Sequence, residues 1–72
     1  LLGPDHINNA VLYNNIGFIY SKIRDYDMSM IYYLKALTIY ENVLGENHNN
    51  AKIVRRNIEV LKTKMPRPAN YL

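Results

Sequence analysis

Apolar residues recur at steps of three and four along most of the chain, which is the spacing of one face of an α-helix. Around residues 8–22 the apolar positions are Leu12, Tyr13, Ile16, Ile19, Tyr20 and Ile23. After a break at residues 23–27 the apolar positions are Met30, Tyr33, Leu34, Leu37, Tyr40, Val43 and Leu44. Around residues 50–64 they are Ala51, Val54, Ile58, Leu61 and Met65. Since no alternating strand pattern competes, the sequence predicts an all-α fold of three antiparallel helices joined by short turns.

Residues that typically cap or stop helices predict where the helices begin and end. An aspartate side chain accepts hydrogen bonds from the free N–H groups of a first helical turn, so Asp25 or Asp27 is expected to begin the second helix. Gly45 is expected to end that helix in the left-handed conformation. Pro66 and Pro68 are expected to stop the third helix and begin a flexible tail.

A short internal repeat divides the chain. The pentamer Leu-Gly-Pro-Asp-His at residues 2–6 recurs as Leu-Gly-Glu-Asn-His at residues 44–48, an offset of 42 residues from Leu2 to Leu44. Both histidines, His6 and His48, follow a glycine turn and precede a helix. We therefore expect their imidazoles to cap or brace that turn, and we expect neither a metal ion nor a cofactor.

Composition narrows the class of protein. The chain has 72 residues, no cysteine and a net charge of +3, so we expect one small domain without disulfides or thiolate metal sites. The charge is well below that of a nucleic-acid-binding tail, which makes nucleic acid an unlikely partner. No apolar run is long enough to span a bilayer and no segment resembles a secretory signal, so a cytoplasmic, intracellular location without membrane contact is expected.

Small residues alternate with tyrosines in a pattern that resembles the tetratricopeptide (TPR) repeat. The first part of that pattern is Tyr13-x2-Ile16-Gly17-x2-Tyr20, and the second is Ser29-x3-Tyr33 followed by Ala36. Gly17, Ser29 and Ala36 are small where two helices would cross closely. The two pentamers and the run Ala10-x-x-Tyr13-Asn14-Asn15-Ile16-Gly17 also resemble the 42-residue repeat of kinesin light chains.

The resemblance implies a piece of an α-solenoid. Residues 1–6 would end a preceding repeat, and residues 7–48 would form one complete TPR-type repeat of two antiparallel helices. Residues 49–65 would be a capping helix or the first helix of a further repeat, and 66–72 a flexible tail. Repeat proteins need about three units for stability, so the chain is expected to be a fragment of a longer array or to complete itself by association.

The resemblance also implies a non-catalytic module that binds a peptide of a partner protein in a concave groove. The groove positions of the first helix would be Val11, Asn14, Asn15, Phe18, Ser21 and Lys22. Asn14 and Asn15 are the main candidates, because a carboxamide offers both a donor and an acceptor to a peptide backbone. The alternative is that they are ordinary surface asparagines in a chain that contains ten of them.

The third helix adds basic groups to this candidate site. Its basic residues are Lys52, Arg55, Arg56, Lys62 and Lys64, of which the first three are candidates for the site. Lys52 and Arg56 are four positions apart and share a face. Together with Asn15 they resemble part of the two-carboxylate clamp of TPR co-chaperones, which implies a preference for acidic or carboxylate groups. The alternative is a solvated face on a terminal helix.

The sequence also bears on two other functions, enzymatic activity and self-assembly. No nucleophile–base pair and no glycine-rich phosphate loop is present, so we expect no enzyme. Self-assembly by stacking through an exposed repeat face is the main alternative to peptide binding, and contact with another domain of the same protein stays open. The tyrosines are expected to be mainly packing residues, with Tyr32 and Tyr40 facing outward.

Overall fold

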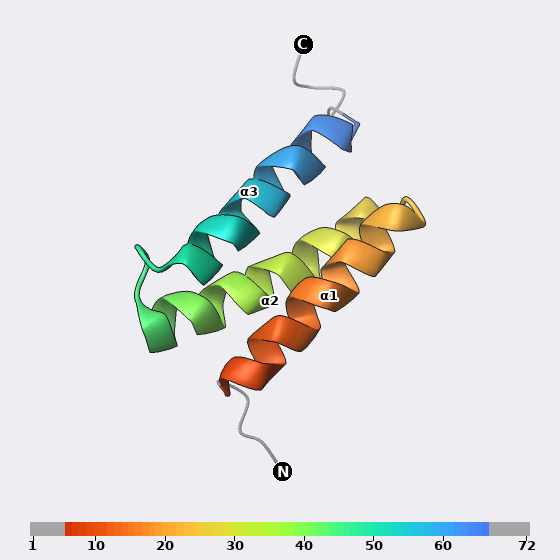
Figure 1. Cartoon of the computed structure of the whole chain (residues 1–72). Helices are drawn as coiled ribbons and strands as arrows, with labels where there is room; N and C mark the ends of the chain where they lie inside the picture. Colours follow the sequence, from red (N-terminus) through yellow and green to blue (C-terminus); the bar gives the residue numbers. More distant parts are fainter. Residues whose placement is uncertain (1–5, 67–72) are drawn as a thin grey trace.

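The computed structural model describes residues 6–66, which fold into three helices and no strand. These are α1 (Ile7–Lys22), α2 (Tyr26–Leu44) and α3 (Asn49–Lys64). The chain reverses at each turn, so that α1 and α3 run in one direction and α2 runs in the other (Figure 1). α2 packs against both of the other helices. The all-α helix-turn-helix repeat fold expected from the sequence is confirmed.

The two histidines of the repeated pentamers cap the helices that follow them. The Nδ1 atom of His6 accepts a hydrogen bond of 3.1 Å from the backbone N–H of Asn8, and Nδ1 of His48 accepts one of 3.1 Å from Asn50. Both histidines have an extended backbone, as N-cap residues do. The predicted capping role of the two imidazoles is therefore confirmed.

Capping residues also define the two ends of α2. Asp25 caps α2 by accepting from the backbone N–H of Met28 at 3.2 Å, which settles the choice between the two aspartates. Gly45 ends α2 with the expected positive φ of 92°, but its ψ of 153° is extended rather than left-handed helical. This backbone leads away from the helix at once, toward the cap of α3.

α1 and α2 cross where small residues let their backbones approach. Gly17, Ser29 and Ala36 are all buried, and the Ser29 hydroxyl donates a hydrogen bond of 2.6 Å to the carbonyl oxygen of Gly17. The ring of Tyr33 fills the space beside Gly17. The close crossing predicted from these small residues is confirmed, and the hydroxyl of Ser29 adds a bond that alanine could not make.

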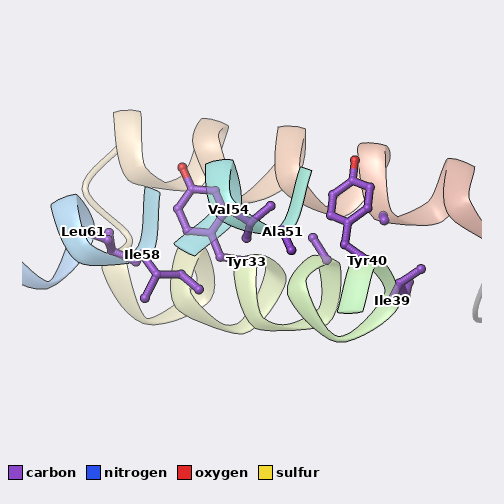
Figure 2. Packing of buried hydrophobic residues seen from close by; sticks show 9 residues of the cluster. Tyr33, Ile39, Tyr40, Ala51, Val54, Ile58 and Leu61 are labelled. Atoms are coloured by element: carbon purple, nitrogen blue, oxygen red, sulfur yellow. The ribbon is translucent and has the colours of Figure 1, made fainter. Parts of the chain in front are cut away.

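α3 covers the remaining side of α2. Its buried residues are Ala51, Val54, Ile58 and Leu61, and Met65 packs against the same core. This is the stripe predicted from the sequence. Figure 2 shows Tyr33 and Tyr40 rising from α2 with their hydroxyl oxygens toward α1. Tyr40 is only 5% exposed, so the expectation that it faces outward was wrong, because α3 supplies the cover that the first two helices lack.

Two parts of the expected domain organisation fall beyond these helices. The end of a preceding repeat was expected at residues 1–6, of which 1–5 lie outside the described residues. The flexible tail was expected at residues 66–72, of which 67–72 lie outside them as well.

Candidate functional site

A furrow runs between α1 and α3 and is lined by residues of both helices. Both helices flank α2, and a hydrogen bond of 3.1 Å from Asn57 Nδ2 to Asn14 Oδ1 joins them directly across the furrow. Both asparagines are half-buried. This carboxamide bridge separates two hollows that follow one another along the helices.

The first hollow, called here the lysine hollow, lies at the C-terminal ends of α1 and α3. It has a volume of about 120 Å³. Its lining residues are Phe18, Ser21, Lys22, Tyr33, Asn57, Val60, Leu61 and Lys64. None of these residues is acidic. The hollow is therefore lined by two lysines together with hydroxyl-bearing, carboxamide and apolar residues.

The second hollow, called here the asparagine hollow, lies at the N-terminal halves of α1 and α3. It has a volume of about 130 Å³. Its lining residues are Asn14, Tyr40, Asn50, Ile53 and Val54. No charged side chain lines it, so the two hollows offer different chemistry to a molecule lying in the furrow.

Exposed apolar side chains lie on both sides of the furrow, one on α1 and one on α3. Phe18 on α1 is 52% exposed and Val60 on α3 is 49% exposed. The Lys22 ammonium lies 5.1 Å from the centre of the Phe18 ring, a cation–π arrangement between two residues that line the lysine hollow. A partner segment that covered these side chains would gain hydrophobic contact as well as polar contact.

The floor of the furrow is neutral. Burial raises the pKa of the Tyr33 hydroxyl above its ordinary value, while hydrogen bonds with the side chains of Ser29 and Ser21 lower it by less. Burial also raises the pKa of Tyr40. Both phenols therefore keep their protons at neutral pH and bring no negative charge to either hollow.

Several groove residues expected from the resemblance do line the furrow. Phe18, Ser21 and Lys22 line the lysine hollow, and Asn14 lines the asparagine hollow. Asn15 is exposed and lines neither hollow. It lies on the same side of α1 as Phe18 and Lys22, at steps of three and four.

The basic candidates of α3 do not gather at the furrow. Lys52 and Arg56 are exposed and line neither hollow. Arg55 forms an ion pair of 2.7 Å with Glu41 of α2. Since helix residues two apart point roughly 200° from one another, Arg55 lies on the opposite side of α3 from Asn57.

Four residues of the furrow were not among the sequence-based candidates. Tyr33 was assigned to packing alone, although it also lines the lysine hollow. Asn57, Val60 and Lys64 occur at steps of three and four on one face of α3, next to the buried stripe. That spacing was readable in the sequence, but which face of α3 meets α1 depends on how α3 packs on α2.

A second surface stands out on the other side of α1. Its exposed apolar residues are Leu12, Ile19 and Ile23, which are 52%, 58% and 66% exposed. Beside them the rings of Tyr13 and Tyr20 each pack on Tyr32, with centroids 5.8 Å and 5.7 Å apart. By contrast, the solvent side of α3 carries charged residues such as Lys52 and Arg56. The two ends of the helix stack are therefore unlike.

Residues 6–66 contain neither a membrane-spanning helix nor a cluster of metal-binding side chains. None of the described helices combines the length and the hydropathy needed to cross a bilayer. No group of three or more metal-binding side chains occurs within the same range. The cytoplasmic location and the absence of enzymatic activity expected from the sequence stay predictions.

Comparison with known proteins defines the family. The family model described as "Tetratricopeptide repeat" matches residues 10–50, and the chain belongs to that family. It is also 38% identical over 60 residues to an uncharacterised protein, ycf37, of Guillardia theta. That match covers 83% of this chain but only 34% of the relative, so the chain spans about a third of the relative's length. No solved structure matches significantly. TPR units generally mediate interactions between proteins and are typically non-catalytic.

Proposed function

We propose that the chain is a protein-interaction module that binds an extended segment of a partner protein in the furrow between α1 and α3. The observation that carries this proposal is the pair of hollows on either side of the Asn14–Asn57 bridge. Carboxamides can donate to and accept from a peptide backbone. Exposed Phe18 and Val60 add apolar contact on the two banks.

A preference for acidic or carboxylate groups forms part of the proposal. The chain has a net charge of +3, and Lys52 and Arg56 stand free to solvent on one face of α3. Together with Asn15 they match part of the residue pattern of a carboxylate clamp, although none of the three lines either hollow. We expect Arg55 to contribute less than these residues, because Glu41 already neutralises its charge.

Binding of short peptides tests this function. Acidic, neutral and basic peptides of equal length would be titrated against the wild type by calorimetry or fluorescence anisotropy. We expect the acidic peptides to bind most tightly, and we expect Asn15→Ala and Arg56→Ala to weaken them. If both variants kept the wild-type affinity, neither residue would belong to the site. If no peptide bound at all, the proposed function would be wrong.

We also propose that residues 7–48 form one repeat of the kinesin-light-chain type and that residues 49–65 form its cap. The two histidine caps, 42 positions apart, support the period. The polar solvent side of α3 supports its role as a cap, since terminal units of repeat proteins carry a polar outer face.

A second candidate function is self-assembly through the outer face of α1. The exposed Leu12, Ile19 and Ile23 favour it, because a row of apolar side chains at a helix face is typical of an interface. Light scattering over a range of concentrations would measure it. Ile19→Glu should abolish any concentration-dependent mass, whereas Ile31→Glu on α2, which is 45% exposed, should leave it unchanged. A constant monomer mass would exclude self-assembly.

A further inference from the structure

The lysine hollow has the chemistry of an anion site. Lys22 and Lys64 line it from opposite banks, and no carboxylate lies among its lining residues. The remaining polar lining groups are the hydroxyls of Ser21 and Tyr33 and the carboxamide of Asn57. One N–H of that carboxamide is bound to Asn14, and an amide group has a second one to donate.

We propose that the lysine hollow binds a single carboxylate of the partner peptide, held between the ammonium groups of Lys22 and Lys64. This inference rests on the proposed function, and it adds a second basic site, lined by Lys22 and Lys64, to the acidic preference proposed for Lys52 and Arg56. The carboxylate can come from an acidic side chain or from the C-terminus of a peptide, and the test below separates the two sources.

Charge balance favours a carboxylate over a phosphate. α1 ends at Lys22 and α3 ends at Lys64, so the negative ends of two helix dipoles, about half an elementary charge each, lie close to the two ammonium groups. The net local charge is then roughly +1. A carboxylate balances that charge, whereas a doubly charged phosphate exceeds it. The hollow also lacks the guanidinium fork that commonly grips phosphate.

The ordinary alternative is that the two lysines only offset the helix dipoles. Lys62 offers a direct comparison, because it lies in the same last turn of α3 and carries the same charge. It pairs with Glu59 at 3.3 Å and lies outside the hollow. If dipole compensation were the whole role of Lys64, the loss of Lys62 would have the same effect on peptide binding.

The asparagine hollow predicts a second position in the bound peptide. Ile53 and Val60 mark the two hollows on α3, and seven helical residues correspond to about 10 Å. An extended peptide covers that distance in roughly three residues. We therefore expect an uncharged residue about three positions from the carboxylate, because no charged group lines the asparagine hollow.

The experiment uses a short neutral host peptide with one glutamate and amidated ends, the same peptide with glutamine, and a neutral peptide with a free C-terminus. We expect Lys22→Met and Lys64→Met each to weaken the glutamate peptide about two- to five-fold, and the double variant about tenfold or more. Lys62→Met is the matched control and should change the affinity little. Binding of the free C-terminus with the same dependence on both lysines would identify a terminal carboxylate as the source.

Four results separate this inference from the proposed function. Equal affinity of the glutamate and glutamine peptides for the wild type would overturn the carboxylate site and leave peptide binding intact. Equal losses in Lys62→Met and Lys64→Met would overturn it in favour of unspecific attraction. Losses confined to Lys52→Met and Arg56→Ala would place the anion elsewhere. Failure of every peptide to shift the backbone amide resonances of Ser21, Lys22 and Lys64 in NMR spectra would overturn the site together with the proposed function.

Discussion

The ring of Tyr33 lies against the backbone of Gly17. A Cβ atom at position 17 would be 2.7 Å from Cδ1 and 2.9 Å from Cε1 of that ring, closer than such atoms approach in folded proteins. Tyr33 cannot easily move aside, because it is 3% exposed and belongs to the core. The contact fixes the distance between α1 and α2 and so positions the floor of the furrow.

Gly17→Ala is expected to destabilise the fold. Overpacking lowers the free energy of unfolding by about 1–3 kcal/mol. The better helix propensity of alanine offsets about 1 kcal/mol of this loss. Urea unfolding followed by circular dichroism would measure the change in the free energy of unfolding. Gly45→Ala is the control, because nothing lies within 4 Å of its Cβ position and any cost there comes from its positive φ. A smaller residue at position 33, as in Tyr33→Leu, should reduce the penalty of Gly17→Ala but not that of Gly45→Ala.

Ser29→Ala is expected to lower the free energy of unfolding by about 0.5–1.5 kcal/mol. The variant loses the 2.6 Å bond to the Gly17 carbonyl, but that carbonyl still accepts the regular helix bond from four residues further on. Ser29→Val tests the size limit at the same position, since Ser29 is fully buried. We expect Ser29→Val to cost more than Ser29→Ala, and the reverse order would contradict the close crossing.

Leu61→Ala is expected to loosen α3 from α2. Leu61 is 2% exposed, and removing a buried leucine side chain costs about 2–5 kcal/mol. The neighbouring Val60→Ala is the matched control, because Val60 is 49% exposed and should affect stability little. Hydrogen exchange of the α3 amides would report the difference, and equal protection in the two variants would contradict the packing of α3.

His48→Ala is expected to fray the start of α3 and to cost about 0.5–1 kcal/mol. The imidazole accepts from the backbone N–H of Asn50, and alanine has no acceptor to replace it. His48→Asp should restore the cap and add a favourable charge, because the first turn of α3 contains no acidic residue. Circular dichroism and thermal unfolding would compare the variants, and equal stability of all of them would contradict the capping role.

Stability is expected to fall at alkaline pH. Burial raises the folded-state pKa of Tyr33 and Tyr40 above the ordinary value of 10.0. Below that value both states keep the phenolic protons; above it the unfolded chain releases them first, so stability is lost as the pH rises toward the folded-state pKa. The urea midpoint should therefore drop above about pH 10. The double variant Tyr33→Phe and Tyr40→Phe should show a smaller drop, and an unchanged drop would contradict this origin.

Much of the local structure could be predicted from particular residues. The three-and-four spacing of apolar side chains gave all three helices, and the repeated pentamer gave both histidine caps. Gly17, Ser29 and Ala36 indicated a close crossing because only small side chains permit it. These features depend on neighbours within a few positions or on one helix pair, which is why a single sequence carries them.

The furrow could not be predicted from the sequence, because its contacts join residues of different helices. Burial of Tyr40, the pairing of Arg55 with Glu41 and the bridge from Asn14 to Asn57 all follow from the rotation at which α3 settles on α2. That rotation is decided by the packing of the buried stripe on α3 against tyrosine rings that lie far away in the sequence. The sequence alone therefore determined the helices, their caps and the repeat, whereas the tertiary structure decided which polar side chains face one another across the furrow, because a rotation of α3 by one residue's angle moves its lysines from one surface to another.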